Sequence, residues 1–360
     1  MNRTFDDLEK QKLETINCTM CGYCKAVCPV FIDVGWDSAS PRGRMILAYG
    51  LLTGEIEPDL SIADRLFQCT NCTDCMRRCP SNAKCPDVVR AARREMVKLG
   101  FVRPAQKMLV DNIETTGNIF ADPELNLPEQ DGPNLLFIGC QHLSRPNATK
   151  KTIRLLDRIG IQVGIMQEVC CGFPLEIMGF TDAHAEQKKR FEDRFKSDSR
   201  PVITLCPSCL VHLQHHYQPS ASHILQEIDR RLDSIPLTPQ TGKVTYHDPC
   251  DLSRGAKIID EPRRILKKMG YDLVEMTNSG NQSRCCGGGG GILTWDAEIA
   301  DHLSKRRIEE AVATGADMVV TACATCEQTL KKGTRMYAEA SGTQPIPVRH
   351  LLDLLSKAIA

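Results

Sequence analysis

The spacing of the cysteines constrains this chain more than any other feature of its sequence. The 360 residues include 19 cysteines, and 18 of these fall into groups with repeated spacings. Residues 1–7 contain no apolar segment of the kind that forms a signal peptide, so we expect a reducing compartment. Thiols in such number in a reducing compartment are metal ligands far more often than disulfide partners.

Two groups near the N-terminus share the pattern Cys-x2-Cys-x2-Cys-x3-Cys-Pro, which is the ligand run of bacterial ferredoxins. In that arrangement three thiolates bind three irons of a cubane 4Fe–4S cluster, and the fourth cysteine crosses to the other cluster. This predicts one cluster on Cys18, Cys21, Cys24 and Cys79, and a second on Cys69, Cys72, Cys75 and Cys28. Zinc is the alternative ion, but zinc sites use paired Cys-x2-Cys knuckles without the further cysteines.

Residues 1–103 are predicted to form an α-helical two-cluster ferredoxin domain. The 40 residues between the two cysteine groups exceed what a compact ferredoxin uses, and they include an apolar run at residues 45–52. Residues 87–99 also have the pattern of a helix. Cys85 belongs to neither group, and we expect it to fill space in the core. Residues 104–133 are polar and rich in Pro, Asp and Asn, which predicts a linker.

From residue 134 onward, short β-rich runs alternate with helical segments, which predicts α/β units on a largely parallel sheet. The expected strands are 135–138, 162–165, 202–205, 244–246, 272–274 and 318–321. The expected helices are 150–159, 185–195, 222–233, 261–269, 297–314 and 326–336.

The same region is an internal repeat, which is visible in its cysteines. The first copy contains Cys140, Cys170, Cys171, Cys206 and Cys209, and the second Cys250, Cys285, Cys286, Cys323 and Cys326. Equivalent cysteines lie 110, 115 or 117 residues apart. We therefore expect two tandem α/β domains, residues 134–240 and 241–360, with their seam near residues 236–242.

Each copy offers five thiolates, two of them adjacent, whereas an ordinary cubane needs four. Adjacent residues on a strand point to opposite faces, so both reach one site only where the chain turns sharply. Gly172 and residues 287–291, which are all glycine, permit such turns. A fifth thiolate indicates an unusual cluster with a bridging cysteine, or one spare reactive sulfur. A zinc site in each copy and a vicinal disulfide are the alternatives.

The repeated pattern resembles the tandem CCG (cysteine-rich) domains in the B-type subunit of heterodisulfide reductase, and the N-terminal part resembles the C-type subunit of the same enzyme. Fused in this order, the chain resembles the D-type subunit of heterodisulfide reductase over nearly its whole length. The resemblance implies one noncubane 4Fe–4S cluster on the five cysteines of each copy, in addition to the two cubane clusters. It also implies that the two noncubane clusters split a disulfide between them, with Cys170, Cys171, Cys285 and Cys286 in catalytic positions. The ferredoxin clusters would then supply electrons.

Several polar residues near the cysteines have more than one possible role. His247 precedes Asp-Pro-Cys250 and either donates a proton or hydrogen bond to a sulfur, or simply anchors the end of a strand. His212, His215 and His216 lie on a polar helix and are expected to be solvated. Arg42 and Arg44 are expected on a charged surface face, which an acidic partner patch could also contact. These roles stay open at the level of sequence.

The chain has no flavin or nicotinamide fingerprint, so it must work with a partner subunit that handles any organic donor. We expect a flavoprotein, a hydrogenase or a membrane cytochrome b, and a disulfide or thiol as substrate. The alternative is an electron conduit towards quinone, because the iron–sulfur subunits of FAD-linked glycolate and lactate oxidases and of anaerobic glycerol-3-phosphate dehydrogenase share this architecture. Residues 40–44 (SPRGR) resemble a stretch of the glycolate oxidase subunit.

Charge and hydropathy exclude some other classes of protein. Lys+Arg and Asp+Glu are both 45, and this balance argues against binding to nucleic acid or to an anionic membrane. No apolar run approaches the ~20 residues of a membrane span. We therefore expect an oxidoreductase subunit in the cytoplasm, held at the membrane, if at all, through a partner.

Overall fold

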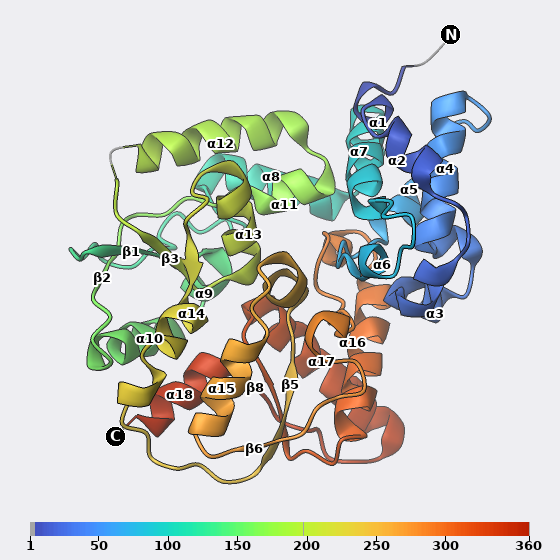
Figure 1. The fold of residues 1–360 in the computed structure, drawn as a ribbon. Helices are drawn as coiled ribbons and strands as arrows, with labels where there is room; N and C mark the ends of the chain where they lie inside the picture. The colour runs from blue at the N-terminus through green and yellow to red at the C-terminus, as the bar shows by residue number, and fades with distance from the viewer. Residues whose placement is uncertain (1–3, 197, 360) are drawn as a thin grey trace.

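The computed structural model describes residues 4–196 and 198–359. Residues 1–3 and residue 360 lie outside the described residues. Residues 1–3 belong to the N-terminal stretch that lacks the pattern of a signal peptide, and residue 360 is the last residue of the second predicted α/β domain. Figure 1 shows a helical N-terminal part beside two small sheets. Among the described residues, no helix is long and apolar enough to cross a membrane.

The N-terminal part is helical, as the sequence predicts. Helix α4 begins at Pro41 because the Oγ of Ser40 accepts a hydrogen bond from Gly43 N at 2.9 Å. A Cβ on Gly43 would lie 2.0 Å from the carbonyl oxygen of Asp37, so only glycine fits there. The helices are α1 (Asp6–Glu9), α2 (Lys12–Asn17), α3 (Pro29–Val34), α4 (Pro41–Thr53), α5 (Leu60–Phe67), α6 (Asp74–Arg77) and α7 (Cys85–Lys98).

Two parallel four-stranded sheets follow, with orders β2-β1-β3-β4 and β6-β5-β7-β8. The identical order in the two sheets confirms the internal repeat. All six predicted strands are present, whereas β4 and β8 were not predicted. The strands are β1 (Asn134–Phe137), β2 (Val163–Gly164), β3 (Val202–Thr204), β4 (Ser222–His223), β5 (Lys243–His247), β6 (Asp272–Leu273), β7 (Met318–Thr321) and β8 (Val348–His350).

All the predicted helical segments contain helix, but the helix expected to begin at residue 222 starts at residue 224, because residues 222–223 form β4. The helices at residues 140–143, 173–178 and 351–358 were not predicted. The helices are α9 (Cys140–Leu143), α10 (Pro146–Arg158), α11 (Phe173–Met178), α12 (Thr181–Phe195), α13 (Pro207–His216), α14 (Ile224–Asp229), α15 (Asp260–Lys268), α16 (Ala297–Val312), α17 (Ala324–Ser341) and α18 (Leu351–Ala358).

The predicted linker contains a helix, α8 (Pro104–Thr116), that the sequence pattern did not predict. Its first turn is stabilised by the Gln106 side chain, which accepts a hydrogen bond from Arg103 N at 3.1 Å. Val110 and Ile113 are buried against the first repeat copy. The polar composition of the segment concealed this two-residue apolar stripe.

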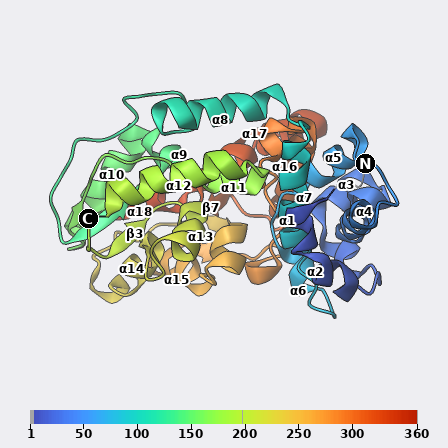
Figure 2. The ribbon, with the colours of Figure 1, turned by 90° about the horizontal axis from the view of Figure 1, so that it is seen from above.

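The three parts of the chain pack closely on one another. One hydrophobic core contains residues from both sheets, so the two copies share an interior. Trp295, from the second copy, stacks on Phe67 of α5 with ring centroids 4.2 Å apart. Figures 1 and 2 both show the N-terminal helices at one end of the molecule, beside α16.

Candidate metal centres

Both N-terminal cysteine groups lie on loops that turn through left-handed residues. Met20 and Gly22 in the first group have φ of 56° and 82°, and Asn71 and Thr73 in the second have φ of 53° and 63°. Cys28 then caps helix α3 with Pro29 in its first turn. Tight turns of this kind bring closely spaced thiols to the same side of the chain.

The fourth cysteine of each group lies with the other group. One small cavity is lined by Cys28, Cys69, Cys72 and Cys75, and also by the buried Cys85. Burial raises the pKa of the Cys28 thiol to about 12, and the nearby thiols of Cys69 and Cys72 contribute in the same direction. Burial also raises the pKa of the Cys18 thiol, and the nearby thiol of Cys79 raises it further. The geometry agrees with the crossed ligand sets, which stay a prediction.

Arg44 lies beside this cavity and not on the surface. It is 1% exposed, and its Nη1 lies 3.9 Å from the sulfur of Cys28. Its Nε donates to the carbonyl oxygen of Arg65 at 2.6 Å. The prediction of a charged surface face is therefore wrong for Arg44, whereas Arg42 pairs with Asp37. A buried guanidinium next to thiols offsets their negative charge when they are ionised.

The repeat cysteines collect at one edge of each sheet. Cys140 follows the last residues of β1, and Cys250 follows the equivalent strand β5. Cys206 and Cys323 follow β3 and β7, and they cap helices α13 and α17. The carboxyl ends of parallel strands are the usual place for ligand binding in open α/β sheets. The repeat therefore places two thiol-rich edges in the molecule.

These two edges face each other across one cavity of about 200 Å³. Its walls include nine of the ten repeat cysteines: Cys140, Cys170, Cys171, Cys206, Cys209, Cys250, Cys286, Cys323 and Cys326. The sulfurs of Cys171 and Cys209 lie 3.7 Å apart. All 19 cysteines lie in the described part of the chain and are free, so the vicinal disulfide alternative does not describe this structure. Apolar side chains such as Leu109, Ile177 and Leu293 complete the walls.

Polar groups order the loops around the first copy's cysteines. The buried carboxyl group of Glu168 accepts hydrogen bonds from Ile138 N at 2.5 Å and Gly139 N at 2.8 Å. Burial raises the pKa of Glu168 to about 8. The hydroxyl of Tyr217 donates to the carbonyl oxygen of Cys171 at 3.1 Å. The sequence patterns indicated neither Glu168 nor Tyr217.

His247 lies among the second copy's thiols. One of its ring nitrogens and the sulfurs of Cys286 and Cys326 all lie within 4.8 Å of one another. Its Nδ1 accepts a hydrogen bond from Arg307 Nε at 3.0 Å, and its Nε2 is buried without a partner. Burial and the charge of Arg307 lower the pKa of His247 to about 3. The imidazole is therefore neutral at pH 7, and its single proton is on Nε2.

The tenth repeat cysteine, Cys285, faces the N-terminal part instead of the shared cavity. The thiol of Cys285 and burial together raise the pKa of Cys72 well above its ordinary value. Arg254 bridges the same junction, because its Nε donates to Cys72 O and its Nη1 to Ser283 O, each at 2.7 Å. The second ferredoxin-type set is thus in direct contact with the second copy.

Arg93 on α7 connects all three parts of the chain. This guanidinium is 0% exposed and donates to the carbonyl oxygens of Cys69, Ile177 and Gly290 at 2.5, 2.8 and 2.8 Å. A sequence signal for it exists. Arg93 lies four residues after Val89 and three before Met96, on the apolar stripe of the helix.

The histidines of helix α13 differ from the sequence prediction. His215 is exposed, as expected, but His212 is 1% exposed and His216 is half-buried. The prediction of a solvated position is wrong for His212. It lies three residues after the buried Cys209 and therefore shares the buried face of the helix.

Two protein families match the chain. Residues 14–83 match the family described as a 4Fe-4S dicluster domain, and residues 135–214 and 244–331 match the family described as a cysteine-rich domain, CCG. A solved structure of a hypothetical protein from Helicobacter pylori superposes with a TM-score of 0.58 at 9% identity, covering 98% of this chain and 72% of the other. That likeness concerns the fold alone.

Curated relatives span most of the chain. The B-type subunit of fumarate reductase (CoM/CoB) from Methanothermobacter marburgensis is 28% identical, over 95% of this chain and 72% of its own length. The D-type subunit of dihydromethanophenazine:CoB–CoM heterodisulfide reductase from Methanosarcina mazei is 26% identical, over 90% of each chain. Together with the domain matches, these relatives show that this chain is an iron–sulfur homologue of the D-type subunit of heterodisulfide reductase.

Proposed function

We propose that this chain receives electrons at its ferredoxin-type sites and uses them for thiol–disulfide chemistry in the cavity between its two cysteine-rich copies. The observation that carries this proposal is the shared cavity itself, because the thiol-rich edges of both copies meet around one space and contribute nine cysteines to its walls. A subunit that only relayed electrons along a single path would not need two such edges facing each other.

The residues present fit four iron–sulfur clusters by their donor chemistry. Thiolates are the ligands that iron–sulfur clusters require, and each of the four groups supplies at least four. We assign cubane clusters to the two crossed N-terminal sets and noncubane clusters to the two five-cysteine sets. Such clusters supply single electrons when bound. The division 1–103, 104–133, 134–240 and 241–360 is our proposal for the domains.

The chain's own groups suit the cavity to a small disulfide. Cleaving one S–S bond consumes two electrons and, for thiol products, two protons. The walls are mostly apolar. A ring nitrogen of the neutral His247 lies within 4.8 Å of the sulfurs of Cys286 and Cys326, and its Nε2–H has no partner among the described residues. Giving up this proton would leave an imidazolate in a buried site. We therefore propose that His247 donates a hydrogen bond from Nε2 to a group bound in this site, and that protons enter from elsewhere.

The contacts between the cysteine sets also suggest the order in which electrons pass from one set to the next. The ferredoxin-type set of Cys69, Cys72, Cys75 and Cys28 contacts the second copy through Cys72 and Cys285. The other N-terminal set includes the exposed Cys21, and we propose it as the entry point for electrons from a partner. We propose a flavoprotein, a hydrogenase or a membrane cytochrome b as that partner, and a cytoplasmic position at the membrane only through it.

Metal analysis and one pair of variants test the proposal on anaerobically purified full-length protein. Four 4Fe–4S clusters require about sixteen irons per chain. Cys286→Ala should abolish disulfide reduction while the ferredoxin-type spectra persist. His215→Ala, which removes an exposed side chain outside the proposed ligand sets, should retain the full iron content. About eight irons with zinc present, or disulfide turnover that survives Cys286→Ala, would contradict the assignment.

The partner that co-purifies with the native chain decides between this function and the conduit alternative. An FAD-linked 2-hydroxy acid oxidase with no disulfide reductase activity would favour an electron conduit towards quinone. A hydrogenase, a flavoprotein of disulfide metabolism or a cytochrome b would favour the cavity chemistry.

A further inference from the structure

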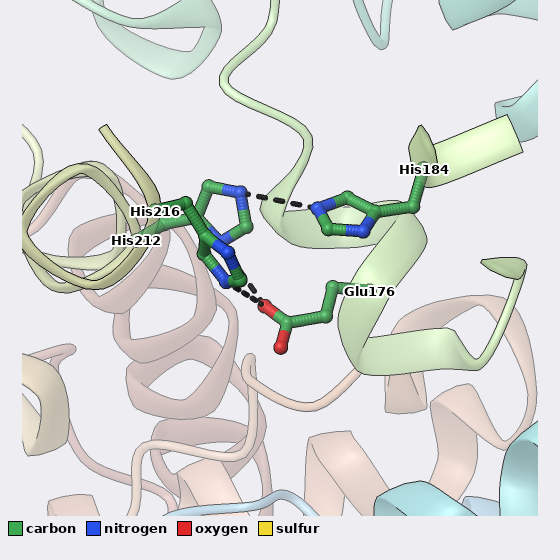
Figure 3. Close-up of side chains that lie close together, drawn as sticks. All are labelled: Glu176, His184, His212 and His216. Carbon is green, nitrogen blue, oxygen red and sulfur yellow. Dashed lines mark hydrogen bonds and ion pairs between the residues drawn. The ribbon is translucent and has the colours of Figure 1, made fainter. Parts of the chain in front are cut away.

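Four potential metal ligands meet beside the first copy's cysteines, in a place that the proposed function does not use. Figure 3 shows Glu176 on α11, His184 on α12, and His212 and His216 on α13 pointing towards one another. The group contains no thiol. One ligand atom from each of the four lies within 4.8 Å of all the others.

The members of this group contact one another through their potential ligand atoms. Oε2 of Glu176 lies 3.1 Å from His212 Nδ1 and 3.4 Å from His216 Nε2. Nε2 of His184 lies 3.4 Å from His212 Nε2. Ligands at about 2.0–2.1 Å in a tetrahedron are separated by roughly 3.3–3.4 Å. The separation between Glu176 and His216 is close to this value. Glu176 and His184 face different nitrogens of His212, Nδ1 and Nε2, so this ring would bind the ion through one nitrogen and the residue that faces the other nitrogen would move towards the ion.

A second observation also points to a missing ligand. His212 Nδ1 is completely buried and makes no hydrogen bond of acceptable geometry, despite its proximity to Glu176. Buried polar atoms without a partner are rare in folded proteins. The His212 and His216 pair, spaced i and i+4 on one helix, presents both rings on the same face.

We propose that Glu176, His184, His212 and His216 bind one Zn²⁺ ion, a site separate from the iron–sulfur centres. Imidazole and carboxylate ligands suit zinc, and a set of four protein ligands is typical of structural zinc sites. The ion would join α11 and α12 to α13, the helix that also carries Cys209. It would hold the two segments that supply the first copy's thiols in a constant relative position.

Zinc binding by the full-length, iron-loaded protein tests this site. The protein is purified anaerobically, supplied with one equivalent of Zn²⁺ and freed of unbound metal. Zinc and iron per chain are then measured, and the zinc ligands are identified by X-ray absorption. We expect about one zinc per chain with only nitrogen and oxygen ligands at about 2.0–2.1 Å. Zinc with sulfur ligands at about 2.3 Å, or no retained zinc, would overturn the proposal.

Two variants and a matched control locate the ion. His216→Ala and Glu176→Gln should each weaken zinc binding by at least about 10-fold, with an unchanged iron content that verifies folding. His215→Ala removes an exposed imidazole from the same helix and should bind zinc like the parent protein. Undiminished zinc binding in both ligand variants would refute the site. Because iron content and disulfide activity are measured separately, failure here is distinguishable from failure of the proposed function.

Discussion

The two cysteine-rich copies share strand order and five cysteine positions, yet their surroundings differ. The first copy is bordered by Glu168, Tyr217 and the histidine cluster of α13. The second copy contacts the ferredoxin-type thiols through Cys285 and encloses the Arg307–His247 pair. The duplicated fold therefore determines the positions of the thiols in both copies. The residues around each sheet edge differ, and those of the second copy contact the ferredoxin-type thiols.

The largest expected effect comes from removing one equivalent cysteine from each copy. Cys285→Ala and Cys170→Ala should each lower disulfide-linked turnover by at least about 100-fold, because each removes a proposed ligand. Only Cys285→Ala should also change the electron paramagnetic resonance signal of the ferredoxin-type site that contains Cys72. Equal changes in that signal for both variants would contradict the inference that only the second copy contacts this ferredoxin-type site.

The next effect concerns the connection of both copies to the N-terminal part. Arg93→Met leaves several buried carbonyl groups without a donor and should lower the free energy of unfolding by roughly 3 kcal/mol. Anaerobic denaturant titration measures this change. Arg94→Met, one position along the same helix and partly exposed, should cost less than about 1 kcal/mol. Similar losses for the two variants would show that Arg93 has no special role.

A pair of buried histidines allows the copies to be compared by pH. His223, the last residue of β4, and His350, the last residue of β8, both accept a backbone N–H at Nδ1, from Leu225 and Leu352, each at 3.3 Å. Burial lowers the pKa of His223 to about 4 and that of His350 to about 3. A depressed folded-state pKa means that stability is present above the unfolded value of about 6.5 and is lost as the pH falls.

His223→Asn and His350→Asn should each flatten this acid dependence. Between about pH 4 and pH 6 the slope of the unfolding free energy should fall by up to about 1.4 kcal/mol per pH unit in each variant. Chemical denaturation over that range measures the slope. An unchanged slope in either variant would mean that its histidine is protonated in the folded protein.

The smallest expected effect lies at the surface between the copies. Arg264 on α15 pairs with Asp229 on α14 through contacts of 2.8 and 2.6 Å, but its side chain is 52% exposed. Arg264→Ala should therefore cost at most about 1 kcal/mol, and less at high salt. Thermal unfolding at two ionic strengths measures both quantities. A larger, salt-independent loss would mean that this pair is a main connection between the copies.

The sequence predicts the parts of this molecule that depend on local patterns. Apolar β-rich runs located β1 and β7, and thiol spacing located the cysteine groups, because both signals span only a few residues. Strands β4 and β8 have two or three residues each and carry no detectable period. The sequence contains one sign of these two strands, because His223 and His350 are each followed by an aliphatic residue and then by leucine. The cysteine spacing did not reveal this similarity.

The residues that surround the sites were harder to predict, for a physical reason. Arg44 and Arg93 are buried because backbone carbonyl groups of other elements accept hydrogen bonds from their guanidinium groups, and a polar side chain otherwise predicts exposure. His212 was misplaced in the same way, since its polarity outweighed its position on a buried helix face. Such side chains become predictable only when the neighbouring elements are known.

The hydrogen bonds from Arg93 to backbone carbonyl groups have a practical consequence for work with fragments. The guanidinium belongs to the first hundred residues, but two of its acceptors, Ile177 and Gly290, belong to later parts of the chain. An expression fragment that ends near residue 103 would leave this cation without those acceptors and expose the apolar face beneath Trp295. The N-terminal part is therefore a poor candidate for expression alone, and the full chain is the smallest unit to isolate.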